Sequence, residues 1–392
     1  MDRRTLLQSG LAAGTLALSG KALAGQAKAA EPALIPIRAD PAEVFRTTVC
    51  LRPFRAMGPR IETEALGRKT VVHNYGHGGS GWSLSWGSAA EAVRLALESH
   101  PGKPSSPKKV AVIGAGALGL TAAITAQRAG ADVTIYARER FPLVRSARAT
   151  GSWTPDSRVA KTAAVDPGFG DLWERMARTS LAMHQSFIGV AGNPVEWMDY
   201  YILRDAPPAP SSSQAPPPPD NTPDPGFIEL SDRLSTIMPR GADLPADGLP
   251  FAAASLRRNV IMTFNVTDYS HQLESDFQMA GGRFEYADFQ SPADLLKLRE
   301  HVLINCTGYG ARALWKDETI TPVRGQIVWL TPQDGVHYGM YHQGVSVLAR
   351  RDGIVVQALG PDDNFGFGDD NETADPVAAQ AAVDQVKSFY KA

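Results

Sequence analysis

The feature that most constrains this chain is a glycine-rich turn at residues 114–119, which reads Gly114-Ala115-Gly116-Ala117-Leu118-Gly119. An apolar run at 110–113 leads into it, and small apolar residues with helical spacing follow. Gly114 permits a tight turn, Gly116 lets backbone amides approach a pyrophosphate, and Gly119 lets the helix pack closely on the strand. A helix N-terminus also attracts an anion. Because strand and helix flank the turn correctly, the pattern predicts a dinucleotide-binding βαβ unit rather than a turn without a ligand.

The nucleotide is not identified by that unit alone. The second strand of the unit, 132–137, ends at Arg138-Glu139, about twenty residues after the last glycine. An acid at this point binds a ribose 2′-hydroxyl and favours NAD or FAD, whereas an arginine favours NADP. Arg138 and Glu139 therefore point to different nucleotides.

Composition favours a small-molecule partner. The chain has 392 residues, 43% of them hydrophobic, which suits two closely packed domains. Its 39 basic and 41 acidic side chains leave a net charge of -2, too weak a field to favour nucleic acid or an anionic membrane. The two cysteines, Cys50 and Cys306, stand beside apolar residues, which predicts buried thiols rather than a disulfide.

The N-terminus resembles a twin-arginine signal peptide over residues 1–24. Arg3 and Arg4 precede a short apolar run that ends in Ala22-Leu23-Ala24, a small-x-small cleavage site. A membrane helix is disfavoured because glycine, serine and threonine dilute the run. The expectation is therefore a periplasmic or secreted protein that uses the twin-arginine export machinery, a route understood to carry folded proteins with their cofactors.

The rest of the chain divides into segments by periodicity and composition. Alternation and β-propensity predict strands at 44–51, 302–305, 325–330 and 354–359, and helical spacing predicts helices at 88–98 and 376–390. Residues 101–107 break all periodicity and indicate a linker. Residues 206–227 are rich in proline, which predicts a mobile extended loop.

A second glycine-rich run, at residues 73–87, selects among the nucleotides. It reads His73-Asn74-Tyr75-Gly76-His77-Gly78-Gly79-Ser80-Gly81-Trp82-Ser83-Leu84-Ser85-Trp86-Gly87 and closely resembles the flavin-binding segment of the D-amino-acid oxidase family. Glycines there let backbone amides reach the N1/O2 edge of the flavin, where a helix dipole stabilises the charge of the reduced ring. The resemblance implies FAD as the cofactor.

Further segments resemble the same family. Cys50-Leu51-Arg52-Pro53 resembles the segment that holds the substrate carboxylate, which assigns this role to Arg52. Residues 148–153 and 303–308 resemble two turns beside the FAD, and 324–327 resembles the family's next strand. The predicted cofactor residues are Gly114, Ala115, Gly116, Ala117, Leu118, Gly119, Arg138, Glu139, Gly151, Ser152, Thr307, Gly78, Gly79, Ser80, Gly81, Trp82 and Ser83.

The order of these segments departs from the family. The arginine segment and the second glycine run normally follow the substrate domain, but here both precede the dinucleotide turn, which indicates a circular permutation. The expected fold is α/β, with a Rossmann-like FAD-binding domain (25–165 and 290–325) and a mixed-sheet substrate domain (166–290 and 325–392). Because chain termini often lie close together, the region around Val44 should lie near the C-terminal helix that ends near Tyr390.

A second departure concerns the tyrosine that partners the arginine in the family. The corresponding strand of this chain has Ser346 at that position, so Tyr338 and Tyr341, slightly upstream, are the candidates to act with Arg52. The family forms its side-chain pocket from the lid region, here 334–344, where no arginine occurs. We therefore expect a preference for neutral D-amino acids or a broad specificity.

The resemblance implies oxidative deamination of D-amino acids to 2-oxo acids and ammonia. An arginine fork binds the α-carboxylate and places the Cα hydrogen over flavin N5 for hydride transfer, with oxygen reoxidising the flavin and giving hydrogen peroxide. A dehydrogenase that uses a quinone or another carrier is the first alternative, and a non-catalytic FAD-binding protein is the second. A homodimer is left open.

A metal site is not expected. His73 and His77 stand four residues apart, which could suggest a ligand pair on a helix. The glycines after His77 indicate a strand-to-turn passage instead, and no third ligand is evident.

Overall fold

The computed structural model describes residues 34–99, 108–206 and 226–391. The expected signal peptide, the linker at 101–107 and most of the proline-rich loop lie outside the described residues. The chain divides into two units, Met1–Leu34 and Ile35–Ala392, and every element below belongs to the second. In the described ranges no helix is both long and apolar enough to cross a membrane.

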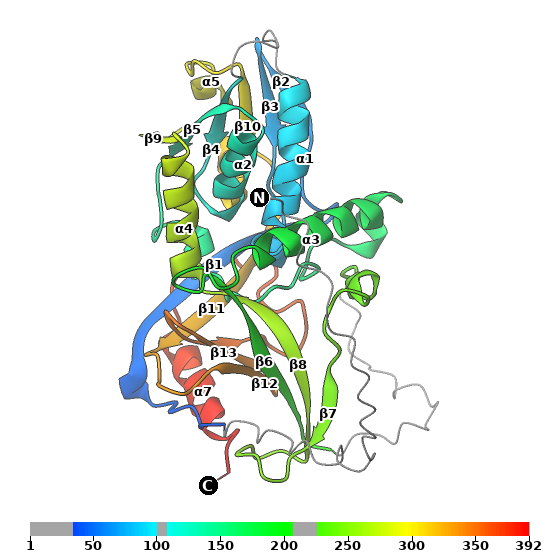
Figure 1. Cartoon of the computed structure of the whole chain (residues 1–392), viewed down its shortest axis with the longest axis vertical. Helices are drawn as coiled ribbons and strands as arrows, with labels where there is room; N and C mark the ends of the chain where they lie inside the picture. The colour runs from blue at the N-terminus through cyan, green and yellow to red at the C-terminus, as the bar shows by residue number, and fades with distance from the viewer. Residues whose placement is uncertain (1–33, 100–107, 207–225, 392) are drawn as a thin grey trace, which may run out of the picture. The chain divides into compact units, whose positions relative to one another are not determined.

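A six-stranded sheet forms one part of the molecule (Figure 1). Its order is β2 (Thr63–Leu66), β3 (Lys69–His73), β10 (Val302–Asn305), β4 (Lys109–Ile113), β5 (Asp132–Ala137) and β9 (Arg283–Tyr286). All neighbours are parallel except the β2–β3 hairpin. The predicted βαβ unit is confirmed, with α2 (Ala117–Arg128) between β4 and β5.

Both faces of this sheet are buried, as is usual for parallel strands. Alternate residues of β4 separate the two cores: Val110 and Val112 join one cluster, and Ala111 and Ile113 the other. Three helices cover the first face, namely α1 (Ser85–Glu98), α2 and α4 (Val266–Met279) (Figure 1). The helix predicted at 88–98 is therefore confirmed and begins three residues earlier.

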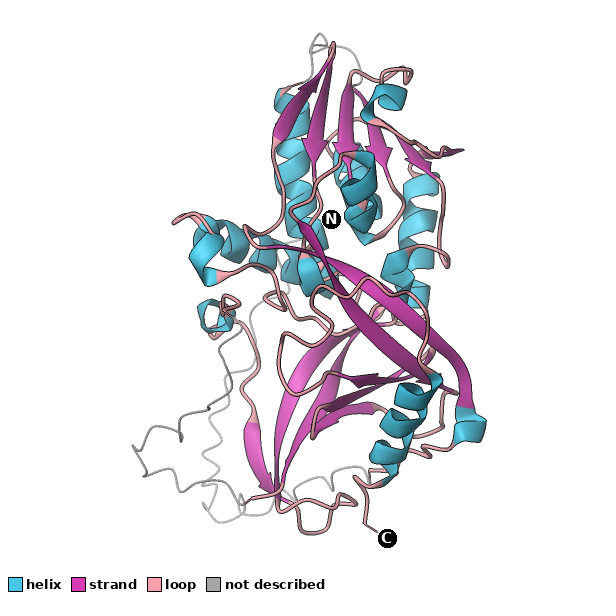
Figure 2. Ribbon diagram, turned by 180° about the vertical axis from the view of Figure 1, so that it is seen from behind, coloured by secondary structure: helices cyan, strands magenta, loops and turns pink. Residues whose placement is uncertain are grey.

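An eight-stranded mixed sheet forms the other part (Figures 1 and 2). Its order is β1 (Val44–Arg55), β11 (Ile320–Leu330), β14 (Gly353–Ala358), β13 (Val345–Arg350), β12 (Tyr338–His342), β6 (Val195–Arg204), β8 (Ser255–Phe264) and β7 (Ala242–Pro245). Only β6 and β12 pair in parallel. The remaining helices are α3 (Phe169–Gln185), α5 (Pro292–Leu295), α6 (Ala311–Leu314) and α7 (Pro376–Lys387). The α/β class, with one Rossmann-like sheet and a second, mixed sheet, is the one that the sequence predicts.

Three elements depart from the expected domain boundaries. Strand β1 was expected with the FAD-binding segments, but it pairs along its whole length with β11 in the eight-stranded sheet. Strand β9 and helix α4 were expected in the substrate domain, but β9 extends the six-stranded sheet beside β5. The places of β1 and β9 are set by pairing with a strand far away in the sequence, which local patterns do not encode.

The start of β1 and the end of the chain lie side by side (Figure 1). The hydroxyl of Tyr338 donates to the carbonyl oxygen of Ile35 at 2.9 Å and lies 2.7 Å from the hydroxyl of Tyr390. Residues 36–43 share a shallow pocket with Lys387 and Tyr390. This proximity is the arrangement that a permuted order requires.

Candidate functional site

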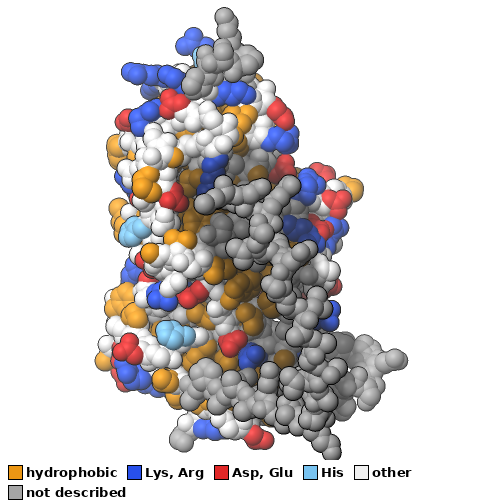
Figure 3. All heavy atoms as spheres, viewed as in Figure 1, with side chains coloured by type: hydrophobic (Ala, Val, Ile, Leu, Met, Phe, Trp, Pro, Cys, Tyr) orange, Lys and Arg blue, Asp and Glu red, His pale blue; other side chains and the backbone are white. Residues whose placement is uncertain are grey.

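A cavity of about 700 Å³ lies between the two sheets, within the range of about 300–1,000 Å³ that small-molecule sites occupy. The turn after β4, the turn after β3, the strand β1 and the strands β6 and β13 all contribute to its wall. On the outer face shown in Figure 3, acidic and basic side chains are interspersed without one dominant sign. Most of the predicted functional residues lie around the cavity and not on the outer surface.

The dinucleotide turn forms one end of the cavity. Residues 114–118 line it, whereas Gly119 packs against the carbonyl oxygen of Gly114, where an added Cβ would clash. Gly114 has a φ of 104°, and a Cβ there would lie 2.7 Å from the carbonyl oxygen of Cys306. Within the described residues, the amides of Ala115, Gly116 and Leu118 donate to no protein acceptor. These free amides at the N-terminus of α2 suit a pyrophosphate.

Arg138 and Glu139 follow β5 and also line the cavity. Arg138 lies 3.5 Å from Glu139 and 3.6 Å from Asp288, and all three side chains are partly exposed. Arg138 is therefore balanced by two acids, Glu139 and Asp288, and both of them line the cavity beside it.

The second glycine run forms the middle of the wall. Gly78, Gly79, Gly81, Trp82 and Ser83 line the cavity, and nothing lies within 4 Å of where a Cβ of Gly81 would point. Ser80 is buried instead, and its hydroxyl donates to the carbonyl oxygens of Thr154 and Ser157, each at 3.1 Å. A short 3-10 turn over Gly78–Ser80 is thus fixed from behind, and its open side faces the cavity.

A buried hydrogen-bond chain fixes Trp82. The Trp86 indole donates to the Tyr269 hydroxyl at 2.8 Å, this hydroxyl lies 2.8 Å from His184 Nδ1, and His184 Nε2 donates to the Trp82 carbonyl oxygen at 3.1 Å. Burial lowers the pKa of His184 to about 3, so the imidazole is neutral. The Trp82 indole in turn donates to the carbonyl oxygen of Ser146 at 2.9 Å.

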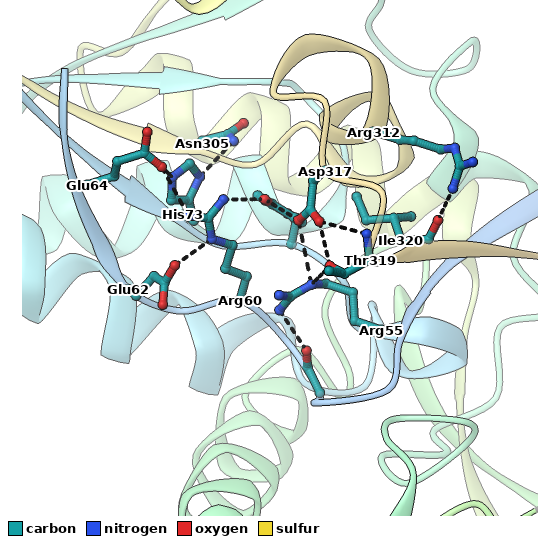
Figure 4. A network of polar contacts seen from close by, with 12 residues as sticks. Arg55, Arg60, Glu62, Glu64, His73, Asn305, Arg312, Asp317, Thr319 and Ile320 are labelled. Atoms are coloured by element: carbon teal, nitrogen blue, oxygen red, sulfur yellow. Dashed lines mark hydrogen bonds and ion pairs between the residues drawn. The ribbon is translucent and has the colours of Figure 1, made fainter. Parts of the chain in front are cut away.

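Gly151, Ser152 and Thr307 lie around the same cavity. The Thr307 hydroxyl donates to Asn305 Oδ1 at 2.7 Å, and Asn305 Nδ2 lies 3.1 Å from His73 Nδ1 (Figure 4). All seventeen predicted cofactor residues therefore lie at this cavity or directly behind it. Their roles remain predictions.

His73 belongs to a polar network behind the wall (Figure 4). Its Nε2 lies 2.9 Å from the Glu64 carboxylate, and burial, the largest cause, lowers the pKa of His73. Arg60 donates to the Tyr75 hydroxyl at 2.9 Å, and Tyr75 donates to Asp317 at 2.7 Å. The residues that the structure describes contain no group of three side chains able to hold a metal ion.

Arg52 faces the cavity from β1 and is half-buried. Its guanidinium lies on the backbone of β11, 3.5 Å from the carbonyl oxygen of Arg324 and directly against Gly325. Among the described residues no carboxylate lies within ion-pair distance of it. Burial is the largest cause that lowers the pKa of Arg52. A half-buried cation without a counter-ion favours binding of an anionic group.

Cys50, two residues before Arg52, also lines the cavity and is half-buried rather than part of the core, which corrects the expectation for this thiol. Cys306 is buried, and both cysteines are free.

The predicted tyrosines do not line the cavity. Tyr338 is buried between Tyr390 and the segment at Ile35, as described above. Tyr341 belongs to the same strand, β12, and the lid region 334–344 contributes nothing to the cavity wall. The role of Tyr338 and Tyr341 therefore stays a prediction, and the cavity lining gives it no support.

Tyr200 on β6, like Tyr136 and Tyr309, lines the cavity, and the sequence patterns did not single it out. Its hydroxyl lies 2.8 Å from the Ser346 hydroxyl on β13. Ser346 is the residue that the resemblance aligns with the family's tyrosine. Burial raises the pKa of Tyr200 to about 12, so its hydroxyl stays protonated. The ring lies against Gly339 of β12, where a Cβ would clash with it. Alternation along β6 could have separated Tyr200 from the core residue Tyr201.

Comparison with known proteins relates this geometry to a family. Residues 109–392 match the family model DAO, described as FAD dependent oxidoreductase. A D-amino-acid oxidase of Dictyostelium discoideum is 49% identical over 61 residues, which are 15% of this chain and 17% of that protein. A D-aspartate oxidase of Homo sapiens is 51% identical over 58 residues, 14% of this chain and 17% of that protein. The aligned segments thus span only 17% of either relative's length.

Solved structures also resemble the chain. Glycine oxidase from Bacillus cereus ATCC 14579 covers 72% of this chain with a TM-score of 0.47 and 12% identity, over 78% of its own length. L-proline dehydrogenase from P.horikoshii covers 72% with a TM-score of 0.46 and 12% identity, over 76% of its own length.

Proposed function

Because the chain belongs to the FAD-dependent oxidoreductase family whose model it matches over residues 109–392, we propose that it oxidises D-amino acids to 2-oxo acids and ammonia. The family implies a flavin cofactor. The observation that carries the substrate assignment is Arg52, a guanidinium in the cavity wall with no acidic partner among the described residues. An α-carboxylate supplies the missing anion in a bidentate geometry.

FAD fits the residues that line the cavity. The free amides at residues 115, 116 and 118 would hold the pyrophosphate, Glu139 would hold a ribose hydroxyl, and the open face at Gly81 leaves room for the ring. When bound, the flavin would supply the acceptor for the hydride from Cα. Identification of the released cofactor tests this assignment: FAD supports it, and a nicotinamide nucleotide would exclude it.

The chain's own residues would bind and orient the substrate. Arg52 would hold the α-carboxylate, and the neutral Tyr200 hydroxyl, fixed by Ser346, would donate a second hydrogen bond to it. No side chain is required to remove the α-proton as a base, because hydride transfer needs only a neutral amine and a fixed geometry. The positive charge of Arg52 favours that neutral amine.

Oxygen is proposed as the electron acceptor, with a quinone or another carrier as the alternative. Peroxide formation is compared with dye reduction for the purified protein and D-amino acids under air. Stoichiometric peroxide supports the oxidase, whereas dye reduction without peroxide supports the dehydrogenase. A flavin that no amino acid reduces would support the non-catalytic alternative.

We further propose export by the twin-arginine route to the periplasm or beyond, on the strength of Arg3 and Arg4. Fractionation of cells that express the wild type or the double variant Arg3→Lys, Arg4→Lys tests it, since only the wild type should leave the cytoplasm. Light scattering of the purified protein decides whether it forms a homodimer.

The segment order is proposed to be a circular permutation. The support is the contact of residues 35–43 with Tyr338 and Tyr390. A rearranged gene that starts at Lys108 and joins Ala392 to Ile35 should yield a folded flavoprotein. Insoluble protein from several lengths of joining segment would contradict the permutation.

A further inference from the structure

A second arginine shares the cavity wall with Arg52. Arg158 lines the cavity, and its side chain is 9% exposed. It has a left-handed backbone, with a φ of 47°, which is uncommon for a residue other than glycine. Arg158 is one of the charges that lower the pKa of Arg52, so the two guanidinium groups lie in each other's field.

The backbone of Arg158 is fixed beside the glycine run proposed for the flavin. The amide of Gly79 donates to the carbonyl oxygen of Ser157 at 3.0 Å, and a Cβ on Gly78 would clash with the carbonyl oxygen of Arg158. The position of Arg158 is therefore set by the same turn that faces the cavity.

The partner of Arg158 is Asp363, whose side chain is 63% exposed. Arg158 Nη2 lies 3.0 Å from the Asp363 carboxylate, and its Nε donates to the Asp363 carbonyl oxygen at 2.7 Å. The surrounding loop is attached to β11, since the amide of Arg324 donates to the carbonyl oxygen of Gly366 at 2.8 Å. The Asp363 side chain can thus rotate into water while the loop and the buried arginine stay in place.

Charge decides which ligand suits this pair. Asp363 is exposed, so moving its carboxylate from Arg158 into water costs little free energy. Arg158 is buried, so leaving its guanidinium without an anion costs much more. With an α-carboxylate on Arg52, a second carboxylate on the same substrate can take the place of Asp363 on Arg158. A cationic substrate side chain would instead have to approach two arginines.

We propose that Arg158 binds a carboxylate in the substrate side chain, so that the preferred substrates are dicarboxylic amino acids. This inference rests on the proposed function and refines it. Arg158 belongs to a segment outside the lid region, and for this reason the lid sequence by itself predicted a neutral or broad preference. Arg158 acts here as a specificity-determining residue, and Asp363 as the carboxylate that the substrate would replace.

Isosteric substrate pairs test the inference most sharply. The ratio of kcat/KM for D-aspartate over D-asparagine, and for D-glutamate over D-glutamine, should exceed about tenfold in the wild type, the size expected for one hydrogen-bonded charge. Arg158→Gln should reduce both ratios to near one while the rates with the amides change little. Asp363→Asn should keep or raise the ratios. Arg204→Gln, which removes an arginine paired with Asp243 away from the cavity, is the matched control.

A purely structural role for Arg158 gives a different result. If the arginine only holds the loop, Arg158→Gln lowers the rates with acids and amides alike and leaves the ratios unchanged, which overturns the inference. A wild type without preference for the acids overturns it as well.

Binding without turnover separates this inference from the proposed function. Malonate and succinate should raise the Tm and perturb the flavin spectrum at concentrations at least about tenfold below acetate, and Arg158→Gln should remove the difference. If no amino acid reduces the flavin but this difference is found, the proposed function fails and the assignment of Arg158 stands. Equal effects of malonate, succinate and acetate on the wild type would refute the assignment of Arg158 alone.

Discussion

The guanidinium of Arg52 lies so close to the backbone of Gly325 that a Cβ there would come within 2.5 Å of Nη1 and 2.6 Å of Nη2. Gly325 does not need its conformational freedom for a turn, since it lies inside β11 opposite Cys50. It provides the space in which the arginine lies flat on the sheet and faces the cavity. The position of the proposed substrate anchor thus depends on a residue that has no side chain of its own.

Gly325→Ala should therefore displace Arg52 without unfolding the protein. Because the clashing atoms are the end of a flexible side chain, the Tm should change little, while KM for amino acids should rise at least about tenfold. Gly168→Ala is the control, since nothing lies within 4 Å of the place that its Cβ would occupy. An unchanged KM in Gly325→Ala would show that Arg52 does not bind the substrate from this position.

Tyr200→Phe should raise KM by about tenfold, because it removes the hydroxyl that Ser346 holds in the cavity. Flavin content should stay unchanged. Tyr338→Phe is the matched control: it removes hydrogen bonds to Ile35 and Tyr390 and should lower stability by about 1 kcal/mol without changing KM. Steady-state kinetics and thermal unfolding of both variants show which of the two tyrosines binds the substrate. The opposite pattern would restore Tyr338 as the active-site tyrosine.

Gly119→Ala should abolish flavin binding. The added Cβ clashes with the carbonyl oxygen of Gly114, so α2 must move away from the turn whose amides would hold the pyrophosphate. The ratio of flavin absorbance to protein absorbance after purification measures the effect, with Gly168→Ala again as the control. A fully loaded Gly119→Ala protein would remove the turn from the cofactor site.

Acid should destabilise the protein partly through His184, whose pKa burial lowers to about 3. The unfolded chain binds a proton on His184 more tightly than the folded protein does. The contribution of neutral His184 to the free energy of unfolding is therefore complete above about pH 6.5 and is lost as the pH falls towards 3, by up to about 1.4 kcal/mol per pH unit. Urea unfolding from about pH 7 to about pH 4.5 measures the slope. His184→Gln should be less stable at neutral pH and show a shallower slope, and an unchanged slope would contradict this assignment.

Local patterns were enough to predict β4, α2 and β5, because the strand, the glycine turn and the helix lie within one continuous segment. The second glycine run was found through its resemblance to a family segment, and its residues lie at the cavity or directly behind it. Arg52 was found through its resemblance to a family segment and not through any periodicity.

What the sequence could not reveal depends on pairing between distant strands. Tyr200 reaches Ser346 only because β6 pairs with β12, which in turn pairs with β13. Tyr338 and Tyr200 look equally suitable in the sequence, and their neighbours alone decide which one lines the cavity. Arg158 was overlooked because its backbone is held at the cavity wall by a contact between distant segments, that of Gly79 with Ser157.

Anaerobic reduction of the flavin by D- and L-amino acids, in the wild type and in Arg52→Ala, tests the proposed reaction and its substrate anchor together. D-amino acids should bleach the wild-type flavin, and the L-enantiomers should not. Arg52→Ala should keep its flavin but need at least about tenfold more substrate for the same bleaching rate, because the α-carboxylate loses its partner. Bleaching of Arg52→Ala at wild-type substrate concentrations would contradict the assignment of Arg52 as the residue that binds the amino-acid carboxylate.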